Sequence, residues 1–166
     1  MSEKVATYPS LESRSVLVTG GGSGIGAEIV RQFARQGSKV AFLDLDRAAS
    51  TALVDEIKAA GQTVSFHACD VTDIEQLRRT IAQVADDQGP ITILINNAAN
   101  DERHRLETVT PEFWDNRFAV NLKHQFFAAQ AVAPGMKAAG GGAIVNLGSI
   151  SWMVGQGGMP GYTTAK

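Results

Sequence analysis

The sequence predicts an α/β fold built on a doubly wound parallel sheet. Along the 166 residues, short apolar runs alternate five times with stretches in which apolar residues recur at helical spacing. The short runs are mostly apolar along their length, which is typical of strands in a sheet that helices cover on both faces. Strands that alternate with helices favour a parallel sheet, because each helix carries the chain back to the start of the next strand.

The first half of the chain contains three strand–helix pairs. We predict strands over residues 15–19, 39–43 and 63–68. We predict helices over residues 24–36, 47–60 and 73–88. A glycine follows each predicted helix, as is common at helix C-termini: Gly37, Gly61 and Gly89. Thr72, with Glu75 close behind it, is predicted to cap the third helix.

The second half contains two further strands and one long helical stretch. The strands are predicted over residues 91–95 and 143–147. The helical stretch follows Pro111, and Pro134 obscures its end. Three consecutive glycines, residues 140–142, form a loop before the last strand.

Composition and charge argue against several classes of protein. The chain has 17 acidic and 15 basic residues, a net charge of -2, so we expect neither a nucleic-acid partner nor an anionic membrane surface. No apolar run approaches the roughly 18 residues of a membrane span, and residues 1–11 lack the apolar segment of a signal peptide. The lone cysteine, Cys69, has no partner for an internal disulfide. We therefore expect a cytoplasmic protein.

A glycine-rich segment, Thr19 to Gly26, joins the first predicted strand to the first helix. Glycines there permit a tight turn and let the backbone approach a pyrophosphate, which the positive end of the helix dipole faces. Asp44 ends the second strand 18 residues beyond Gly26, close to the spacing of about 20 for a residue that binds the adenosine ribose. Its charge predicts NAD rather than NADP, although Arg47 could reach a phosphate. A flexible turn and a solvated acid at a strand end are the alternatives.

Together these features predict a Rossmann-like, dinucleotide-binding fold. Such a sheet has six strands in its full form, whereas five are visible in this sequence. We therefore expect the C-terminal strands to be absent from this chain, which stops at Lys166. We predict an N-terminal arm over residues 1–12 and one dinucleotide-binding domain, truncated at its C-terminus, over residues 13–166.

Three further motifs follow the glycine segment. Asn96-Asn97-Ala98-Ala99 follows the fourth strand, and Asn121 lies in the long helix. Ser149 precedes Tyr162 by 13 residues, and Tyr162 begins the segment Tyr162-Thr163-Thr164-Ala165-Lys166. With these motifs in this order, nearly the whole chain resembles the short-chain dehydrogenase/reductase family. Ala99 departs from the family pattern, in which glycine is usual, and we expect its methyl group to crowd the cofactor slightly.

The chemistry of alcohol oxidation accounts for these residue types. Hydride transfer from an alcohol requires a base for the hydroxyl proton, and free tyrosine, with a pKa of about 10, is a poor base at neutral pH. Lys166, one helical turn after Tyr162, is placed to stabilise the tyrosinate. The resemblance implies that Lys166 also binds the nicotinamide ribose, that Ser149 polarises the substrate oxygen, and that Asn121 bends its helix and holds a proton-relay water. The alternative for each of these residues is a surface or structural role.

The resemblance also implies a set of cofactor-binding residues. Asp70 and Val71, after the third strand, are expected to contact adenine, although Asp70 could equally belong to a helix cap. Asn97 is expected to stabilise the central sheet beside the cofactor. The complete predicted set is Gly20, Ser23, Gly24, Ile25, Gly26, Asp44, Asp70, Val71, Asn97, Ala98, Tyr162 and Lys166.

The segment 100–105 is very polar for a region beside the nicotinamide and could bind a polyhydroxylated substrate, with a solvated turn as the alternative. Residues 8–11, 100–104, 131–136 and 148–152 are similar to NAD-dependent aldose 1-dehydrogenases of the D-xylose type. That similarity implies oxidation of a sugar's anomeric hydroxyl to a lactone. Trp152 could stack on the sugar ring or cover the core. The predicted substrate contacts are Ser149, Ser151, Trp152, Gln156 and Tyr162.

We predict no metal site, because His67 and His104 have no partners at a metal-ligand spacing. Two other functions remain open. One is a short-chain reductase of an oxo-acyl, polyol or ketone substrate, and the other is a non-catalytic NAD-binding fragment. The full-length form is expected to be a homo-oligomer, either a dimer or a tetramer.

Overall fold

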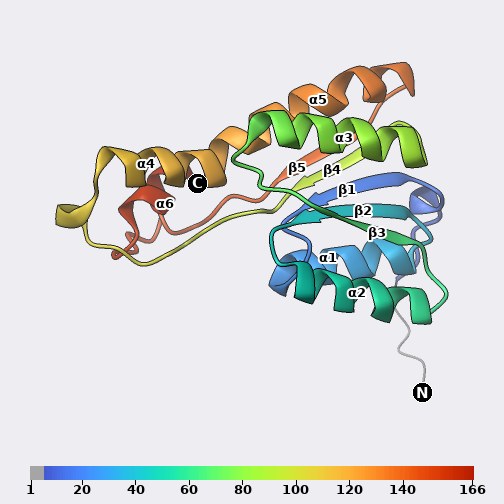
Figure 1. Ribbon diagram of the computed structural model, residues 1–166, viewed down its shortest axis with the longest axis horizontal. Helices are drawn as coiled ribbons and strands as arrows, with labels where there is room; N and C mark the ends of the chain where they lie inside the picture. Colours follow the sequence, from blue (N-terminus) through green and yellow to red (C-terminus); the bar gives the residue numbers. More distant parts are fainter. Residues whose placement is uncertain (1–5) are drawn as a thin grey trace.

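A five-stranded sheet forms the centre of the protein, in the strand order β3-β2-β1-β4-β5 (Figure 1). The computed structural model describes residues 6–166. The strands are β1 (Ser15–Thr19), β2 (Lys39–Asp44), β3 (Val64–Ala68), β4 (Ile93–Asn96) and β5 (Ala143–Asn146). Every neighbouring pair is parallel, so the predicted α/β class is confirmed. The strand order reverses between β1 and β4, and such a switch point opens a crevice at the carboxyl ends of the strands.

Two pairs of helices cover the two faces of the sheet (Figure 1). One pair is α1 (Gly24–Arg35) and α2 (Arg47–Ala59), and the other is α3 (Ile74–Gln88) and α5 (His124–Ala138). Because side chains alternate along a strand, Val16 and Val18 pack on the first pair and Leu17 on the second. All three side chains are fully buried, which explains why the inner positions of this strand are apolar.

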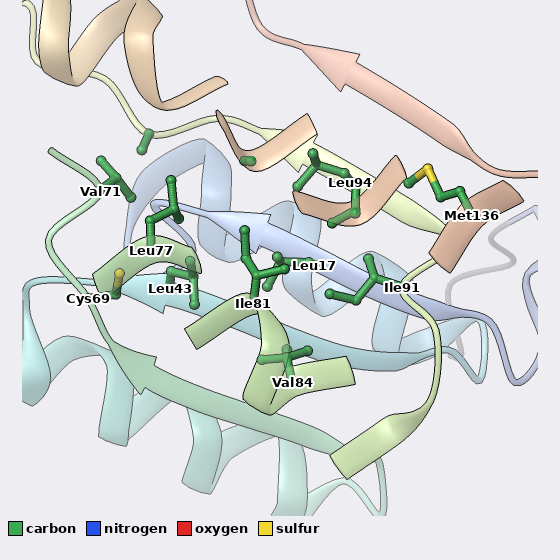
Figure 2. Packing of buried hydrophobic residues seen from close by; sticks show 14 residues of the cluster. Leu17, Leu43, Cys69, Val71, Leu77, Ile81, Val84, Ile91, Leu94 and Met136 are labelled. Carbon is green, nitrogen blue, oxygen red and sulfur yellow. The ribbon is translucent and has the colours of Figure 1, made fainter. Parts of the chain in front are cut away.

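Figure 2 shows the core between the sheet and the helices α3 and α5. The strands contribute leucines, and the helices contribute aliphatic side chains and one methionine. The labelled members of this cluster include Leu17, Leu43, Leu77, Ile81, Val84, Leu94 and Met136. Burial of each large aliphatic side chain contributes on the order of 1.5–3 kcal/mol. The packing fixes the carboxyl ends of β1, β2 and β4, where the polar residues described below lie.

The N-cap of α3 is Asp73, so the prediction that Thr72 caps this helix was wrong. The Asp73 side chain accepts a hydrogen bond from the Gln76 amide (2.9 Å). The Thr72 hydroxyl instead donates to the Asp70 carboxylate (2.7 Å). Both residue types suit an N-cap, and the bond to Asp70 removes Thr72 from that role.

The long helical stretch predicted after Pro111 divides into three segments. They are α4 (Pro111–Phe118), a π-helical segment η3 (Ala119–Lys123) and α5. The α5 helix continues through Pro134 to Ala138, so Pro134 does not end it. A π-helical turn inside an α-helix changes the direction of the side chains that follow, and such turns are frequent at functional sites.

Residues 6–12 lie along the edge of the α1 layer and include a short 3₁₀ turn, Pro9–Leu11. Gln36 holds this segment with both ends of its amide, which donates to the Ala6 carbonyl (2.9 Å) and accepts from the Tyr8 amide (2.8 Å). The Ser38 hydroxyl donates to the Leu11 carbonyl (2.7 Å). Residues 1–5 of the predicted arm lie outside the described residues, and the division of the chain at residue 12 remains a prediction.

The helices α4 and α6 (Pro160–Ala165) lie together beyond the carboxyl ends of β4 and β5, outside the layered part of the molecule (Figure 1). The segment between β4 and α4, which contains the 3₁₀ turn Leu106–Thr108, reaches the same region. No helix in the described part of the chain is both long and apolar enough to cross a membrane.

Candidate active site

The glycine segment forms a tight turn between β1 and α1. Gly20 and Gly24 adopt positive φ angles of 66° and 52°, a region that side-chain-bearing residues rarely occupy. At Gly26, a Cβ atom would lie 1.9 Å from the carbonyl oxygen of Gly20. A side chain at Gly26 would therefore displace the turn. With glycine at this position, only backbone atoms form the surface there, at the start of α1.

The N-terminus of α1 lacks a side-chain cap. Its N-cap residue, Ser23, makes no capping hydrogen bond, whereas Asp46 caps α2 and Asp73 caps α3. Helix N-termini carry amide groups without intrahelical partners and a partial positive charge. The start of α1 is thus suited to an anion such as a pyrophosphate.

Asp44 lies at the end of β2 and holds the glycine segment. One carboxylate oxygen accepts from the Gly22 amide (2.8 Å), and the other accepts from the Asp46 amide (2.9 Å). An ionised carboxylate has about four acceptor sites, so these two bonds leave acceptor sites for further donors. Asp44 can therefore bind the hydroxyls of a ribose while it fixes the turn.

Thr19 and Asn97 join the ends of β1 and β4. The buried Thr19 hydroxyl accepts from the amides of Asn97 and Ala98, both at 3.1 Å. The Asn97 side chain donates to the carbonyls of Thr19 (3.1 Å) and Gly20 (2.8 Å). These four bonds set the width of the crevice at the point where the strand order reverses.

A hollow of about 510 Å³ lies over these elements. Of the predicted cofactor-binding residues, it is lined by Gly20, Ser23, Gly24, Ile25, Gly26, Asp44, Val71, Asn97 and Ala98. Ala99, the departure from the family pattern, lines it as well. Asp70 does not line it, because its carboxylate accepts from the amide (2.9 Å) and hydroxyl of Thr72. Asp70 thus shapes the turn after β3, and its contact with adenine remains a prediction.

Tyr162 lies in α6, one turn before Lys166, which follows the helix directly. The Lys166 ammonium donates to the carbonyl of Leu147, just after β5 (2.5 Å). This contact ties the tyrosine–lysine segment to the same edge of the sheet as the glycine segment. Burial lowers the pKa of Lys166. A positive charge one turn from a phenol favours the deprotonated phenol.

His124, at the start of α5, is fully buried near Lys166. Neither of its ring nitrogens has a hydrogen-bond partner among residues 6–166. Burial and, to a smaller extent, the charge of Lys166 lower the pKa of His124 to about 4. The imidazole is therefore neutral at physiological pH.

Ser149 and Ser151 form a local pair after β5. Their hydroxyls are 2.9 Å apart, and the Ser149 hydroxyl accepts from the Ser151 amide (3.1 Å). Ser151 is only 1% exposed, so it orients Ser149 and would have to move to touch a ligand. Trp152, at 60% exposure, and the exposed Gln156 lie on the loop that follows. Their contacts with a substrate remain predictions.

Asn121 lies in the π-helical segment and is fully buried. Its amide group donates to the carbonyls of Arg117 (3.0 Å) and Asn100 (3.1 Å), and its side-chain oxygen accepts from the Asn100 amide (2.9 Å). Its backbone carbonyl accepts from the Gln125 side chain (3.0 Å). Asn121 therefore joins the helical bend to the segment after β4, and a relay water at this residue remains a prediction.

Within residues 6–166, no group of three or more histidine, cysteine, aspartate or glutamate side chains could hold a metal ion. The glycine-lined crevice is lined by neither Tyr162 nor Lys166, which the sequence predicts to bind the cofactor. The Lys166 ammonium reaches the end of β5 at the same edge of the sheet, and its contact with a cofactor remains a prediction. The family model described as short chain dehydrogenase matches residues 14–166. The chain belongs to the short-chain dehydrogenase family.

The names of two relatives of this chain describe dehydrogenases of sugars. D-xylose 1-dehydrogenase of Caulobacter vibrioides is 47% identical over 161 residues, and a probable galactose dehydrogenase of Rhizobium meliloti is 47% identical over 160 residues. The alignments cover 97% and 96% of this chain, and 63% and 62% of the two relatives. The chain thus spans less than two thirds of their length.

Solved short-chain dehydrogenase structures share the arrangement of these elements. A metagenomic short-chain oxidoreductase in complex with NADP has a TM-score of 0.89 and 34% identity, over 95% of this chain and 72% of that one. A short chain dehydrogenase from Mycobacterium smegmatis has a TM-score of 0.90 and 28% identity, over 99% of this chain and 70% of that one.

The family motifs alone do not indicate three residues at this site, Thr19, His104 and His124. A polar residue at the end of an apolar strand is a signal for Thr19, because a buried hydroxyl there must find hydrogen-bond partners. His104 and His124 carry no such signal. Their positions depend on contacts with α6 and Lys166, which lie far away in the sequence.

Proposed function

We propose that the full-length protein is a nicotinamide-dependent sugar dehydrogenase, which oxidises the anomeric hydroxyl of an aldose to a lactone with NAD. The observation that carries this proposal is the position of Tyr162 and Lys166 at the same sheet edge as the glycine-lined crevice. The sugar class rests on the 47% identity with D-xylose 1-dehydrogenase over 97% of this chain.

The residues of the crevice fit a dinucleotide. The space beside Gly24 leaves room for a pyrophosphate at the uncapped start of α1, since no neighbouring atom lies within 4 Å of a Cβ position built there. Asp44 would hold the adenosine ribose, and Asn97 and Ala98 would border the cofactor in the hollow. When bound, the nicotinamide supplies a hydride acceptor. The crevice thus supports the proposed contacts with the pyrophosphate and with the adenosine ribose.

The remaining residues accept the substrate proton, bind the substrate oxygen and hold the edge of the site. As a phenolate, Tyr162 accepts the proton of the substrate hydroxyl. The positive charge of Lys166 stabilises this phenolate before the proton is transferred. The Ser149 hydroxyl donates to the Ser151 hydroxyl in the structure; when a substrate binds, Ser151 donates to Ser149 instead, and Ser149 donates to the substrate oxygen. Asn121 keeps the segment after β4 in place at the edge of the site.

Asp44 is expected to determine the choice of NAD over NADP. Asp44→Asn keeps an acceptor for the Gly22 amide and removes the charge that would repel a 2′-phosphate. We expect the ratio of kcat/KM for NADP to that for NAD to rise about tenfold to a hundredfold, as about 1–3 kcal/mol of repulsion disappears. Steady-state kinetics with both cofactors on the full-length protein measures this ratio.

The matched control for this prediction is Arg47→Ala, three residues further on and exposed. If Asp44 determines the choice, Arg47→Ala leaves the ratio nearly unchanged. A ratio that falls in Arg47→Ala and stays constant in Asp44→Asn contradicts the role of Asp44.

The substrate class is tested with a panel of sugars and alcohols. With NAD, we expect the full-length protein to form reduced nicotinamide with pentoses or hexoses that have a free anomeric hydroxyl. Methyl glycosides of the same sugars, in which that hydroxyl is blocked, are expected to give no reaction. Trapping of the product with hydroxylamine detects the lactone.

Other outcomes of this panel separate the alternatives. Turnover of polyols or secondary alcohols alone rejects the sugar proposal and favours a polyol or ketone reductase. Binding of NAD in calorimetry without turnover of any substrate favours the non-catalytic NAD-binding role. Assembly into a dimer or tetramer and a cytoplasmic location remain predictions, which light scattering and cell fractionation test.

A further inference from the structure

The polar segment 100–105 is fixed at both ends. At one end, Asn100 exchanges two hydrogen bonds with the Asn121 side chain in the helical bend, at 2.9 and 3.1 Å. At the other end, the backbone amide of His104 donates to the carbonyl of Gly158 (2.8 Å), shortly before α6. The segment therefore bridges the bend between α4 and α5 and the short helix that carries Tyr162.

The side chain of His104 makes a second contact with α6. Its Nε2 lies 3.0 Å from the amide nitrogen of Gly161, and its Nδ1 lies 2.8 Å from the carbonyl oxygen of Glu102. An amide can only donate and a carbonyl can only accept, so Nε2 is the acceptor and Nδ1 carries the proton. His104 thus binds as a neutral imidazole with a defined tautomer.

The contact replaces a missing helix cap. The α6 helix has six residues, and its N-cap residue, Met159, makes no side-chain capping bond. Its first residue is Pro160, which has no amide hydrogen, so the amide of Gly161 is the first that needs an acceptor. Ser, Thr, Asp or Asn at an N-cap satisfies this second helical amide, and here His104 does so from 57 residues away.

Neighbouring side chains fix the imidazole ring. The His104 ring lies edge-on to Phe113, with ring centroids 4.6 Å apart. Arg117, whose side chain is 7% exposed, lies over the same Phe113 ring (4.8 Å) and pairs with Glu102 (3.3 Å). A Cβ atom at Gly161 would lie 3.0 Å from the side chain of Arg117, so α6 packs closely on this group. The ring is therefore held from α4 and from its own segment.

We propose that His104 is a positioning residue for Tyr162. It holds the N-terminus of α6 at Gly161, and so keeps the phenol of Tyr162, the next residue, in place for proton transfer. This inference rests on the proposed function in so far as it concerns the reaction. A helix of six residues has little stability of its own, so an external acceptor at its first free amide has a large influence on its order. His104 touches neither substrate nor cofactor in this role.

Three variants separate the two hydrogen bonds of His104. His104→Gln places an acceptor near the Nε2 position, toward Gly161, whereas His104→Asn reaches only the Nδ1 position, toward Glu102. His104→Phe retains the packing on Phe113 and has neither polar atom. In the full-length protein, we expect His104→Gln to keep kcat within about threefold of the wild type. We expect His104→Asn and His104→Phe to lose about tenfold or more, the order of one lost capping bond.

Two further measurements separate positioning from a general loss of structure. The dissociation constant of NAD is expected to change by less than kcat in His104→Asn and His104→Phe, because, of the predicted cofactor-binding residues, only Tyr162 and Lys166 belong to the segment that His104 holds. Amide hydrogen exchange of the segment 158–166 is expected to accelerate in His104→Asn and His104→Phe and not in His104→Gln. This second readout does not require turnover.

The outcomes distinguish this inference from the proposed function. If exchange follows the predicted order while the wild type oxidises no sugar, the sugar proposal fails and the anchoring of α6 by His104 stands. If exchange and kcat are the same in His104→Gln and His104→Asn, or if neither changes in any variant, the positioning role of His104 is overturned.

Discussion

Replacement of Tyr162 by phenylalanine is expected to reduce kcat by about 10²–10⁴-fold, the range that one general acid or base contributes. Phenylalanine fills the same space and lacks the hydroxyl that receives the substrate proton. The variant therefore keeps the packing of α6 and loses the proposed proton acceptor. Stopped-flow and steady-state measurement of reduced nicotinamide on the full-length protein tests this expectation.

The chain offers a matched control, because it has two tyrosines. Tyr8 is 56% exposed and does not line the crevice, and its amide donates to the Gln36 side chain, so Tyr8→Phe removes the same kind of hydroxyl and is expected to leave kcat unchanged. Calorimetry is expected to give the same NAD affinity for both variants within about twofold. Unchanged turnover in Tyr162→Phe, or equal losses in the two variants, contradicts the role of Tyr162 as the base.

Most of the fold follows from the sequence because the central strands of the sheet, β1 and β4, are buried on both faces. The inner positions of such strands are apolar, and the glycines that end the helices mark the turns. At the start of α3, Thr72 and Asp73 are equally suitable caps by residue type, and only the tertiary contact of Thr72 with Asp70 decides between them. The error in the predicted cap has this cause.

The π-helical bend could not be predicted from helix propensity. No glycine or proline lies within residues 112–133, so the local sequence favours an unbroken helix. The bend coincides with the side chain of Asn121, which binds the Arg117 carbonyl and both backbone groups of Asn100. The bend depends on the contact of Asn121 with Asn100, 21 residues away, and the pattern of apolar residues cannot indicate such a contact.

The candidate site was predictable where backbone geometry dictates the residue type. Gly26 is required by its close approach to Gly20, and Asp44 is positioned by the end of β2. The burial of Ser151 was not predictable in this way. Its position two residues after Ser149 suggests a substrate contact and gives no information on its exposure. The contact of His104 with Gly161 spans 57 residues and joins the segment 100–105 to the start of α6, so no local signal indicates it.

His124 is expected to make the free energy of unfolding depend on pH between about 4 and 6.5. Burial and the charge of Lys166 lower its pKa from the usual 6.5 to about 4, so the folded protein keeps the imidazole neutral in this range while the unfolded chain binds a proton. Stability therefore is fully present above about pH 6.5 and falls as the pH decreases toward 4. The full contribution is about 3 kcal/mol, from about 1.4 kcal/mol per unit of pKa difference.

The variant His124→Leu tests this expectation. Neither ring nitrogen of His124 makes a hydrogen bond of good geometry within residues 6–166, and the nearby Val120 backbone only partly offsets the lowering of its pKa, so an apolar side chain of similar volume gives up little. We expect the variant to match the wild type within about 1 kcal/mol at pH 7.5 and to exceed its stability by about 2 kcal/mol at pH 5. Urea denaturation of the full-length protein across this pH range measures the difference.

His67 provides the comparison that makes the assignment specific. Burial lowers its pKa too, but it is only half-buried in β3 and its ring contacts Ser65 (3.3 Å). His67→Leu is therefore expected to remove a smaller part of the pH dependence and to leave most of the slope in place. If the slope persists in His124→Leu and disappears in His67→Leu, the unfolding equilibrium is coupled to the strand histidine, and the buried imidazole beside Lys166 does not control it.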